Sequence, residues 1–436
     1  MITEVNKRNL TRSFLINIFI FFPLIILFLF PETSVSTVLA IKKESLYSIY
    51  LFKLWGLTLA DLIIIYFFGI LINNLIFFRK LDFGILLPIF IIYSFYYFVG
   101  ILYNLFINLE IKGLLYDFKV GLYIFIPYLL LKNCIKSFDL KEKHIIIILI
   151  CFFFSSMYDT IYVYTTNQLV QYPQILKIPV YLEFLPIVLL IGLAFYLKKT
   201  IRYLCLLLIL ISAVSAINRV HLGSLISLGS AMVFITIFYI EKSKINFNKI
   251  EFIFFLTLII IVVNVITPTF LLLFAKNIVN LKVDGFLIRI NEILNFFLNI
   301  NINFTSIIGK GLGSTYIQFV EPQQTGIYAQ GPFLNTNNKF IHHQTISGSF
   351  YKFGIIGYFL ISVILTSLCF RLIKLSQMGI IEKDFAKFLA FSIPTFMIIN
   401  LIGPGILKGA LLTSILLFAC DKLLTKYQNE LKKLNA

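Results

Sequence analysis

The sequence predicts an all-α polytopic membrane protein, and three observations lead to this fold class. Of the 436 residues, 59% are hydrophobic and only 13% are charged, and the mean hydropathy is +0.94, outside the range of soluble proteins. Apolar runs of about 15 to 25 residues recur along almost the whole chain, which is the length that crosses a bilayer as a helix. No stretch is polar enough for a separate soluble domain, so residues 1–436 are predicted to form one integral membrane domain. Soluble enzymes, secreted modules and nucleic-acid-binding proteins are excluded.

The first predicted span is an apolar run from about residue 13 to residue 30. Lys7, Arg8 and Arg12 precede it, as in a signal peptide, but no small-residue cleavage site follows, so we expect an uncleaved anchor. Eleven further apolar runs complete a prediction of about twelve transmembrane helices, at about 54–78, 84–107, 114–131, 145–163, 178–197, 203–217, 220–240, 251–275, 346–370, 386–402 and 406–421.

The distribution of basic residues predicts that both termini are cytoplasmic. With this orientation the termini and the predicted inner loops hold 23 of the 37 Lys and Arg residues, as the positive-inside rule expects. The net charge of +17 therefore records mainly topology, and it does not by itself indicate a polyanionic partner. None of the 5 cysteines falls in a predicted outer loop. No disulfide is expected, and no Cys/His spacing indicates zinc.

One predicted outer connection, residues 276–345, is much longer than the others. A loop of this length is usually functional or disordered, and its apolar content argues against disorder. Apolar residues recur at helical spacing between residues 286 and 297, with Arg289 near the edge of the apolar face. We therefore expect a helix that lies along the membrane surface.

Four carboxylates are predicted near the outer ends of spans, namely Asp61, Asp117, Asp159 and Glu183. An ionisable group at membrane depth costs about 2.5 to 3.5 kcal/mol and usually faces a cavity or a charged partner. The four residues therefore indicate either a polar cavity open to the outside or hydrated groups at the membrane interface. They do not cluster as a magnesium site would, and neither a metal nor a cofactor is expected.

Two short motifs supply candidate functional residues on the outer side. Arg219 lies in the tight turn between the seventh and eighth spans, where positive charge is disfavoured. Its planar guanidinium can bind a diphosphate at two points, although an arginine that contacts lipid phosphate would also occupy this position. Further along, Gly309, Lys310 and Gly311 form a glycine-rich turn in the long loop.

A third motif, His342, His343 and Gln344, directly precedes the tenth span. Gly354 and Gly357 follow His343 by eleven and fourteen residues, and small residues on a helix permit close packing against a neighbour. A histidine at the outer mouth of a span can act as a general base near neutral pH. A polar histidine at the interface is the alternative.

In order and spacing, these motifs resemble those of the O-antigen ligase and polymerase superfamily, which assembles bacterial envelope polysaccharides. The resemblance covers about residues 200–370 in motif detail, and the twelve-span plan with one long outer loop covers the rest. By this resemblance, Arg219 and Arg289 correspond to the two arginines of the family, and His343 corresponds to its histidine. Asn218 stands where the family usually has serine, and Gln344 where it usually has asparagine.

The resemblance implies a GT-C-like membrane glycosyltransferase, without metal or cofactor, in the bacterial inner membrane with its active site facing the periplasm. The substrate would be an undecaprenyl-diphosphate-linked oligosaccharide taken from the lipid bilayer, and the anomeric carbon would be inverted. Arg219 and Arg289, helped by Lys310, would clamp the diphosphate while His343 takes the proton from the acceptor hydroxyl. The remaining candidates for substrate binding are Gly309, Gly311, His342 and Gln344.

The motifs do not separate a polymerase of repeat units from a ligase that transfers glycan to lipid A core or to protein. Polymerase is the favoured reading, because a divergent chain that keeps only the skeleton of the motifs is typical of such enzymes. From a different class, a lipid-linked oligosaccharide flippase also has about twelve spans, but it would show two related halves. Whether a chain-length regulator and a flippase act beside this protein stays open, as does its oligomeric state.

Overall fold

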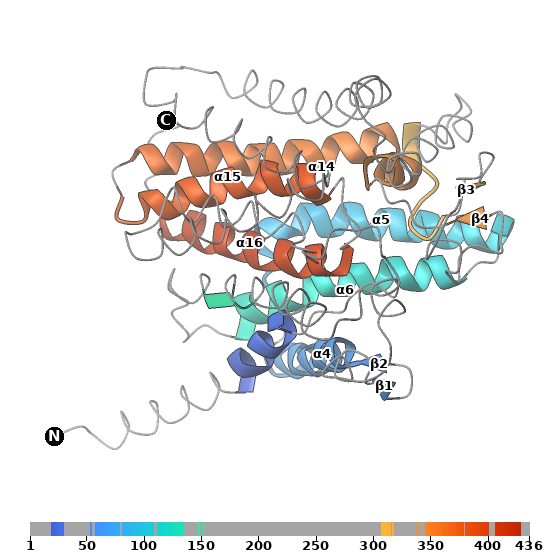
Figure 1. Cartoon of the computed structure of the whole chain (residues 1–436), viewed down its shortest axis with the longest axis horizontal. Coiled ribbons are helices and arrows are strands. Elements are labelled where there is room, and N and C mark those ends of the chain that lie inside the picture. Colours follow the sequence, from blue (N-terminus) through green and yellow to red (C-terminus); the bar gives the residue numbers. More distant parts are fainter. Residues whose placement is uncertain are drawn as a thin grey trace, which may run out of the picture.

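The computed structural model describes residues 19–29, 53–54, 57–78, 81–108, 111–134, 147–148, 151, 307–314, 316–317, 338–339, 345–378, 380–400 and 406–428. Within these ranges the chain is mainly helical, as the sequence predicts (Figure 1). Four predicted spans lie wholly outside the described residues, and so does nearly all of the span at 145–163.

Long helices make up most of the described fold: α4 (Leu59–Phe78), α5 (Leu87–Tyr103), α6 (Ile111–Cys134), α14 (Thr345–Gln377), α15 (Lys383–Asn400) and α16 (Ile406–Lys426). Shorter elements join or flank them: the 3-10 helix η1 (Gly84–Leu86), the π-helix η2 (Asn104–Asn108), and the strands β1 (Lys53–Leu54), β2 (Leu57–Thr58), β3 (Tyr316–Ile317) and β4 (Asn338–Lys339). The strands form two antiparallel pairs, β1 with β2 and β3 with β4.

Four of the described helices are long and apolar enough to cross a membrane: Leu59–Phe77, Gly84–Phe106, Gly113–Cys134 and Tyr351–Gln377. They overlap the second, third, fourth and tenth predicted spans, although several of their ends differ from the predicted ones. A shorter apolar helix, Phe19–Leu29, lies within the first predicted span, and α15 and α16 cover the last two. The described residues are mainly helical, as predicted, apart from the four two-residue strands, while the total of twelve spans stays a prediction.

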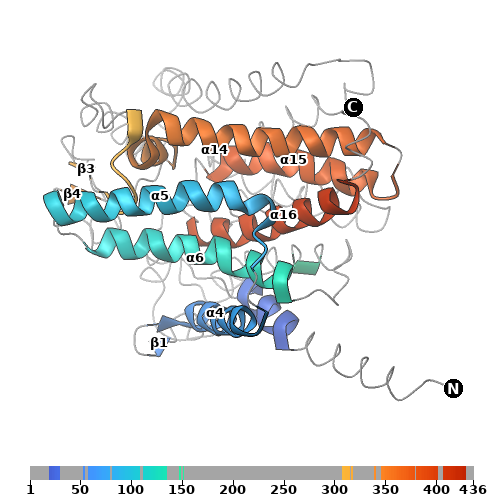
Figure 2. The same cartoon turned by 180° about the vertical axis from the view of Figure 1, so that it is seen from behind.

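Contacts near the helix ends show how the helices run. Lys352 near the start of α14 lies 2.7 Å from Asp117 in the first part of α6, and Lys132 near the end of α6 pairs with Asp421 near the end of α16. These three helices therefore run in one direction, and α5 and α15 run in the other (Figures 1 and 2). If each crosses the membrane, the parallel α6 and α14 require an odd number of crossings between them. The five predicted spans meet that requirement.

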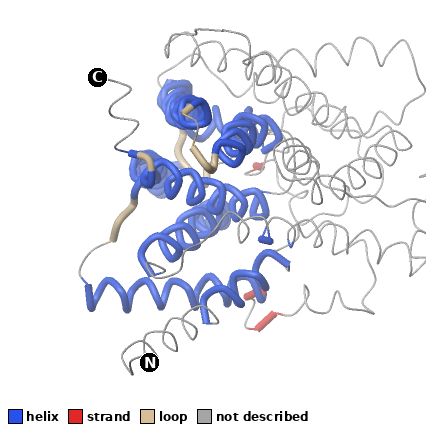
Figure 3. The backbone as a smooth tube through the Cα atoms, turned by 90° about the vertical axis from the view of Figure 1, so that its left-hand side faces the viewer, coloured by secondary structure: helices blue, strands red, loops and turns tan. Residues whose placement is uncertain are grey.

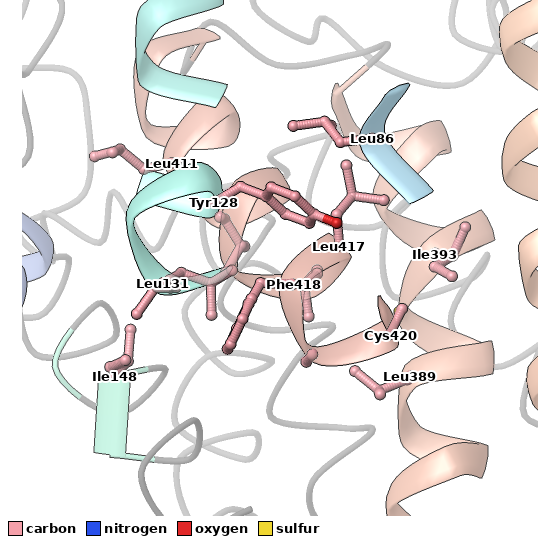
Figure 4. Packing of buried hydrophobic residues seen from close by; sticks show 14 of the residues in the cluster. Leu86, Tyr128, Leu131, Ile148, Leu389, Ile393, Leu411, Leu417, Phe418 and Cys420 are labelled. Carbon is pink, nitrogen blue, oxygen red and sulfur yellow. The ribbon is translucent and has the colours of Figure 1, made fainter. Parts of the chain in front are cut away.

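The hydrophobic core runs from α4 and α6 through α16 to α14 and α15, and Figure 4 shows the part around α16. Tyr128 of α6 is fully buried and meets Phe418 of α16 edge-on, with ring centroids 6.2 Å apart. Leu86 of η1 packs near Tyr128, and α15 contributes Leu389 and Ile393 to the same cluster. The helix α4 crosses α6 on the side away from α14 and runs across the other helices rather than along them (Figure 3). The glycine-rich turn lies at the other end of α5 and α6, beside Gly100 and Asp117.

Candidate functional site

The glycine-rich turn at residues 309–314 is the part of the predicted site that the structure describes. Gly309, Gly311 and Gly313 have φ values of +87°, +85° and +74°, a region that residues with a side chain rarely adopt. Glycine at every second position therefore follows from a backbone that enters the left-handed region three times. The turn lies between α5, α6 and the first part of α14 (Figure 1).

The turn is attached to a break in α14. Gly354 has φ +62° and ψ −176°, so the helix is interrupted there, and a break frees carbonyl groups of the preceding turn from the helical ladder. The N–H of Lys310 donates to the Tyr351 carbonyl at 3.0 Å, and the N–H of Gly311 donates to the Lys352 carbonyl at 2.9 Å. The glycine-rich turn thus supplies hydrogen bonds to the interrupted helix.

Close approach of backbones explains the glycines on both sides of this contact. A Cβ atom on Gly309 would lie 2.4 Å from the Lys352 carbonyl oxygen, and one on Gly311 would lie 2.2 Å from the nitrogen of Gly100 in α5. Real Cβ atoms essentially never come within 3.0 Å of a heavy atom outside their own and the adjoining residues. The turn can therefore occupy this place only because these positions carry no side chain.

The prediction that Gly354 and Gly357 permit close packing is confirmed, with a difference in detail. A Cβ on Gly357 would lie 2.6 Å from the ring of Tyr96, so this glycine does admit the neighbouring helix α5. Gly354 is in contact with the glycine-rich turn instead, with a would-be Cβ 2.4 Å from the nitrogen of Gly309. It is the break in α14 rather than part of a continuous helix, because its φ is positive.

Asp117 of α6 joins the turn to α14. Its Oδ2 accepts a hydrogen bond from the N–H of Gly313 at 2.6 Å, and its Oδ1 lies 2.7 Å from the Nζ of Lys352. The carboxylate is buried, with a residue exposure of 5%. Both oxygens are therefore engaged, each with a different segment of the chain.

Lys310 presents the charged side chain of the turn. Its Nζ lies 2.6 Å from the hydroxyl of Tyr351 and 4.4 Å from the centroid of the same ring, and the Tyr103 ring lies 5.8 Å away. Burial lowers the pKa of the Lys310 ammonium below its ordinary value. In the part of the chain that the structure describes, no Asp or Glu forms an ion pair with it. A partly buried ammonium of this kind is able to bind an anion.

The backbone of the turn is already hydrogen-bonded to the protein. The N–H groups from Lys310 to Gly313 donate in turn to the carbonyls of Tyr351, Lys352 and Tyr96 and to the carboxylate of Asp117. They do not point at an open anion-binding site as the N–H groups of a phosphate-binding loop do. For Gly309 and Gly311, predicted to contact substrate, the contacts seen are with the protein, and the Lys310 side chain is the group that can reach a ligand.

Of the four carboxylates predicted at the outer ends of spans, the structure describes two, and each of these forms an ion pair with a lysine. Asp61 is buried and lies 3.0 Å from the Nζ of Lys119, and it also accepts hydrogen bonds from Thr58 and Tyr123. Asp117 has the partners given above. Neither is simply a hydrated interfacial group: both are buried and ion-paired, as charges at membrane depth usually are. Asp159 and Glu183 lie among the residues not described.

The remaining predicted site residues, Arg219, Arg289, His342, His343 and Gln344, also lie outside the described residues. The chain on both sides of the histidine motif is nevertheless located. Tyr316 pairs with Lys339 in the β3–β4 ladder, shortly after the glycine-rich turn, and α14 begins at Thr345. The strand before the histidine motif thus pairs with the strand that follows the turn, and the helix after the motif accepts hydrogen bonds from the turn itself.

Sequence reasoning missed the partners of the turn on α5 and α14, namely Gly100, Tyr351 and Lys352. Lys352 carried a usable signal, because a lysine several residues inside a predicted span needs a buried counter-charge. Gly100 carried none, since a single glycine in an apolar helix has many explanations. Among the described residues, no group of three or more His, Cys, Asp or Glu could hold a metal ion.

Comparison of the chain with protein-family models, with curated proteins and with solved structures found no match.

Proposed function

We propose that this protein is a membrane glycosyltransferase that polymerises repeat units of a bacterial surface glycan from an undecaprenyl-diphosphate-linked donor. The observation that carries the proposal is the attachment of the Gly309–Gly313 turn to the start of α14, the helix that begins two residues after His343. In the resembling superfamily the glycine turn and the histidine are two motifs of one active site. Here a break in α14 and a shared carboxylate join the turn to the helix that follows the histidine.

The proposed reaction is direct displacement at the anomeric carbon. The acceptor hydroxyl loses its proton to the imidazole of His343 while its oxygen bonds to that carbon. The bond between the carbon and the diphosphate oxygen breaks, and undecaprenyl diphosphate leaves with the electron pair and with inversion. Arg219, Arg289 and the Lys310 ammonium offset the charge that develops on the diphosphate, so the reaction needs no metal.

The donor reaches this site from the bilayer, because its polyprenyl chain is soluble only there. Apolar side chains exposed on α5 and on α14 beyond Gly354 border the region of the turn, among them Phe98, Leu102 and Ile355. They are equally what a lipid-facing helix needs, so they support membrane embedding and not a specific donor.

The test of the proposal is the glycan ladder of a strain that lacks this gene, with and without the wild-type gene returned. We expect the strain to carry surface glycan of a single repeat unit, and lipid-linked single units to accumulate. Long lipid-linked chains that never reach lipid A core would instead identify a ligase. Accumulation of donor confined to the inner leaflet would identify a flippase, and an unchanged ladder would refute all three readings.

A second prediction concerns the pH dependence of transfer. Burial lowers the pKa of Lys310, so its ammonium is charged below that pKa and loses its charge as the pH rises through it. We expect the transfer rate to fall as the pH rises through this pKa, which gives the pH profile of the rate an alkaline limb. Arginine stays protonated to higher pH, so Lys310→Arg should move the limb upward, and Lys310→Met should lower the rate by about 10²-fold and remove the limb. Pre-steady-state transfer in proteoliposomes across pH measures this, and a limb that persists in Lys310→Met contradicts it.

A further inference from the structure

Asp117 is the residue through which three parts of the site meet. We propose that its carboxylate is a positioning group for glycan transfer: by accepting the N–H of Gly313 it holds the glycine-rich turn in the place that transfer requires. The inference rests on the proposed function for its effect on rate. Its effect on the position of the turn can be measured without any activity.

The contacts around Asp117 form a closed circuit, that is, a series of contacts that begins and ends in the glycine-rich turn. Oδ2 accepts from Gly313 at 2.6 Å and Oδ1 from Lys352 at 2.7 Å. Lys352 adjoins Tyr351, whose hydroxyl lies 2.6 Å from the Nζ of Lys310. Lys310 lies three residues before Gly313, which completes the circuit. A displacement at any member therefore moves the ammonium proposed to contact the diphosphate.

The acceptor at position 117 has a separate role from the charge. The ammonium of Lys352 requires a counter-charge because it is largely removed from solvent, with a side-chain exposure of 18%. The N–H of Gly313 requires only an acceptor, and leaving it without one would favour release of the turn. The effect of losing the ion pair can therefore be separated from the effect of losing the acceptor if Lys352 is made neutral in every variant of Asp117.

The chain contains a matched control. Asp61 and Lys119 form a pair of the same composition, 3.0 Å apart, with Asp61 also buried. Within the described part of the chain, the Asp61 side chain accepts hydrogen bonds from Thr58, Lys119 and Tyr123, and none from the glycine-rich turn. Loss of this pair removes a buried ion pair between two helices and leaves the turn attached.

Three double variants test the proposal. Asp117→Asn with Lys352→Met keeps an acceptor for Gly313 and removes both charges. Asp117→Leu with Lys352→Met has a similar shape and no acceptor. Asp61→Leu with Lys119→Met is the control. All three avoid leaving a lone buried charge, so all three should accumulate in the membrane.

A cysteine in place of Ser314 reports the position of the turn. Ser314 is 1% exposed, and the native cysteines are not in predicted outer loops, so a membrane-impermeant maleimide applied from outside should label only a released turn. We expect the Asp117→Leu pair to raise labelling at least tenfold and to lower kcat by about 10²-fold with little change in KM. The Asp117→Asn pair and the Asp61 control should stay protected and within about fivefold of the wild-type kcat.

Equal protection and equal kcat in the two Asp117 variants would overturn the proposal, because the acceptor would then have no role. Equal loss in both would also overturn it, because charge alone would be responsible. If the ladder experiment refutes a glycosyltransferase, the maleimide labelling still decides whether Asp117 holds the turn. Failure of the proposed function and failure of this inference are thus distinguished.

Discussion

Replacement of His343 by alanine is expected to lower glycan transfer by about 10²- to 10⁴-fold, the usual contribution of a general base. The acceptor hydroxyl has a pKa far above neutrality, so without a base it is a weak nucleophile. The arginines and Lys310 would remain, and the donor should still bind. In cells, the expected result is a ladder that stops at one repeat unit even though the variant protein accumulates normally in the membrane.

His342→Ala is the matched control for this prediction. The two histidines are adjacent and equally polar, but only His343 has the spacing to the glycines at the start of α14 that the superfamily motif requires. We expect His342→Ala to retain a ladder of normal length. A normal ladder from His343→Ala would remove the catalytic assignment, and a short ladder from His342→Ala alone would transfer it to the neighbouring residue.

The largest expected effect on folding is that of Gly311→Ala. The new Cβ would lie 2.2 Å from the backbone nitrogen of Gly100, and the φ of +85° is one that alanine disfavours. The left-handed conformation costs about 1–2 kcal/mol and overpacking about 1–3 kcal/mol, so the free energy of unfolding should fall by about 2–5 kcal/mol unless the turn detaches. Either outcome lowers the Tm of the detergent-solubilised protein or releases the Ser314→Cys reporter to labelling.

Gly69→Ala provides the comparison. Gly69 lies in the middle of α4, and a Cβ there would meet nothing within 4 Å. Alanine is about 1 kcal/mol better than glycine inside a helix of a soluble protein, so we expect an unchanged or slightly raised Tm and a normal ladder. A loss of stability in Gly69→Ala as large as that in Gly311→Ala would mean that the close backbone contact at Gly311 is not the cause of its effect.

Much of the fold could be predicted because membrane helices depend on local sequence. A bilayer requires about twenty apolar residues in a helix whose backbone is hydrogen-bonded within itself. The runs at about 54–78, 84–107 and 114–131 meet that condition, and α4, α5 and α6 occupy them. The glycine-rich turn could also be predicted, since glycine at alternate positions permits a backbone that few other residues adopt.

The partners of the turn could not be predicted in the same way. The bond between Gly313 and Asp117 joins residues 196 positions apart, and the ion pair of Asp117 with Lys352 joins residues 235 positions apart. Four carboxylates were equivalent candidates in the sequence, and nothing local distinguished Asp117, which contacts the turn, from Asp61, which does not. That distinction depends on which helices are neighbours.

The sequence by itself determined that this protein is mainly helical and embedded in a membrane, and roughly where several of its helices lie, because those properties follow from the length and apolarity of continuous segments. Only the tertiary structure decided that Gly354 interrupts α14 and that Lys310 lies against Tyr351. Both depend on the backbone of residues 309–313 filling the space between α5, α6 and α14. Such a fit is set by distances between segments that are remote along the chain, and a local pattern contains no information about those distances.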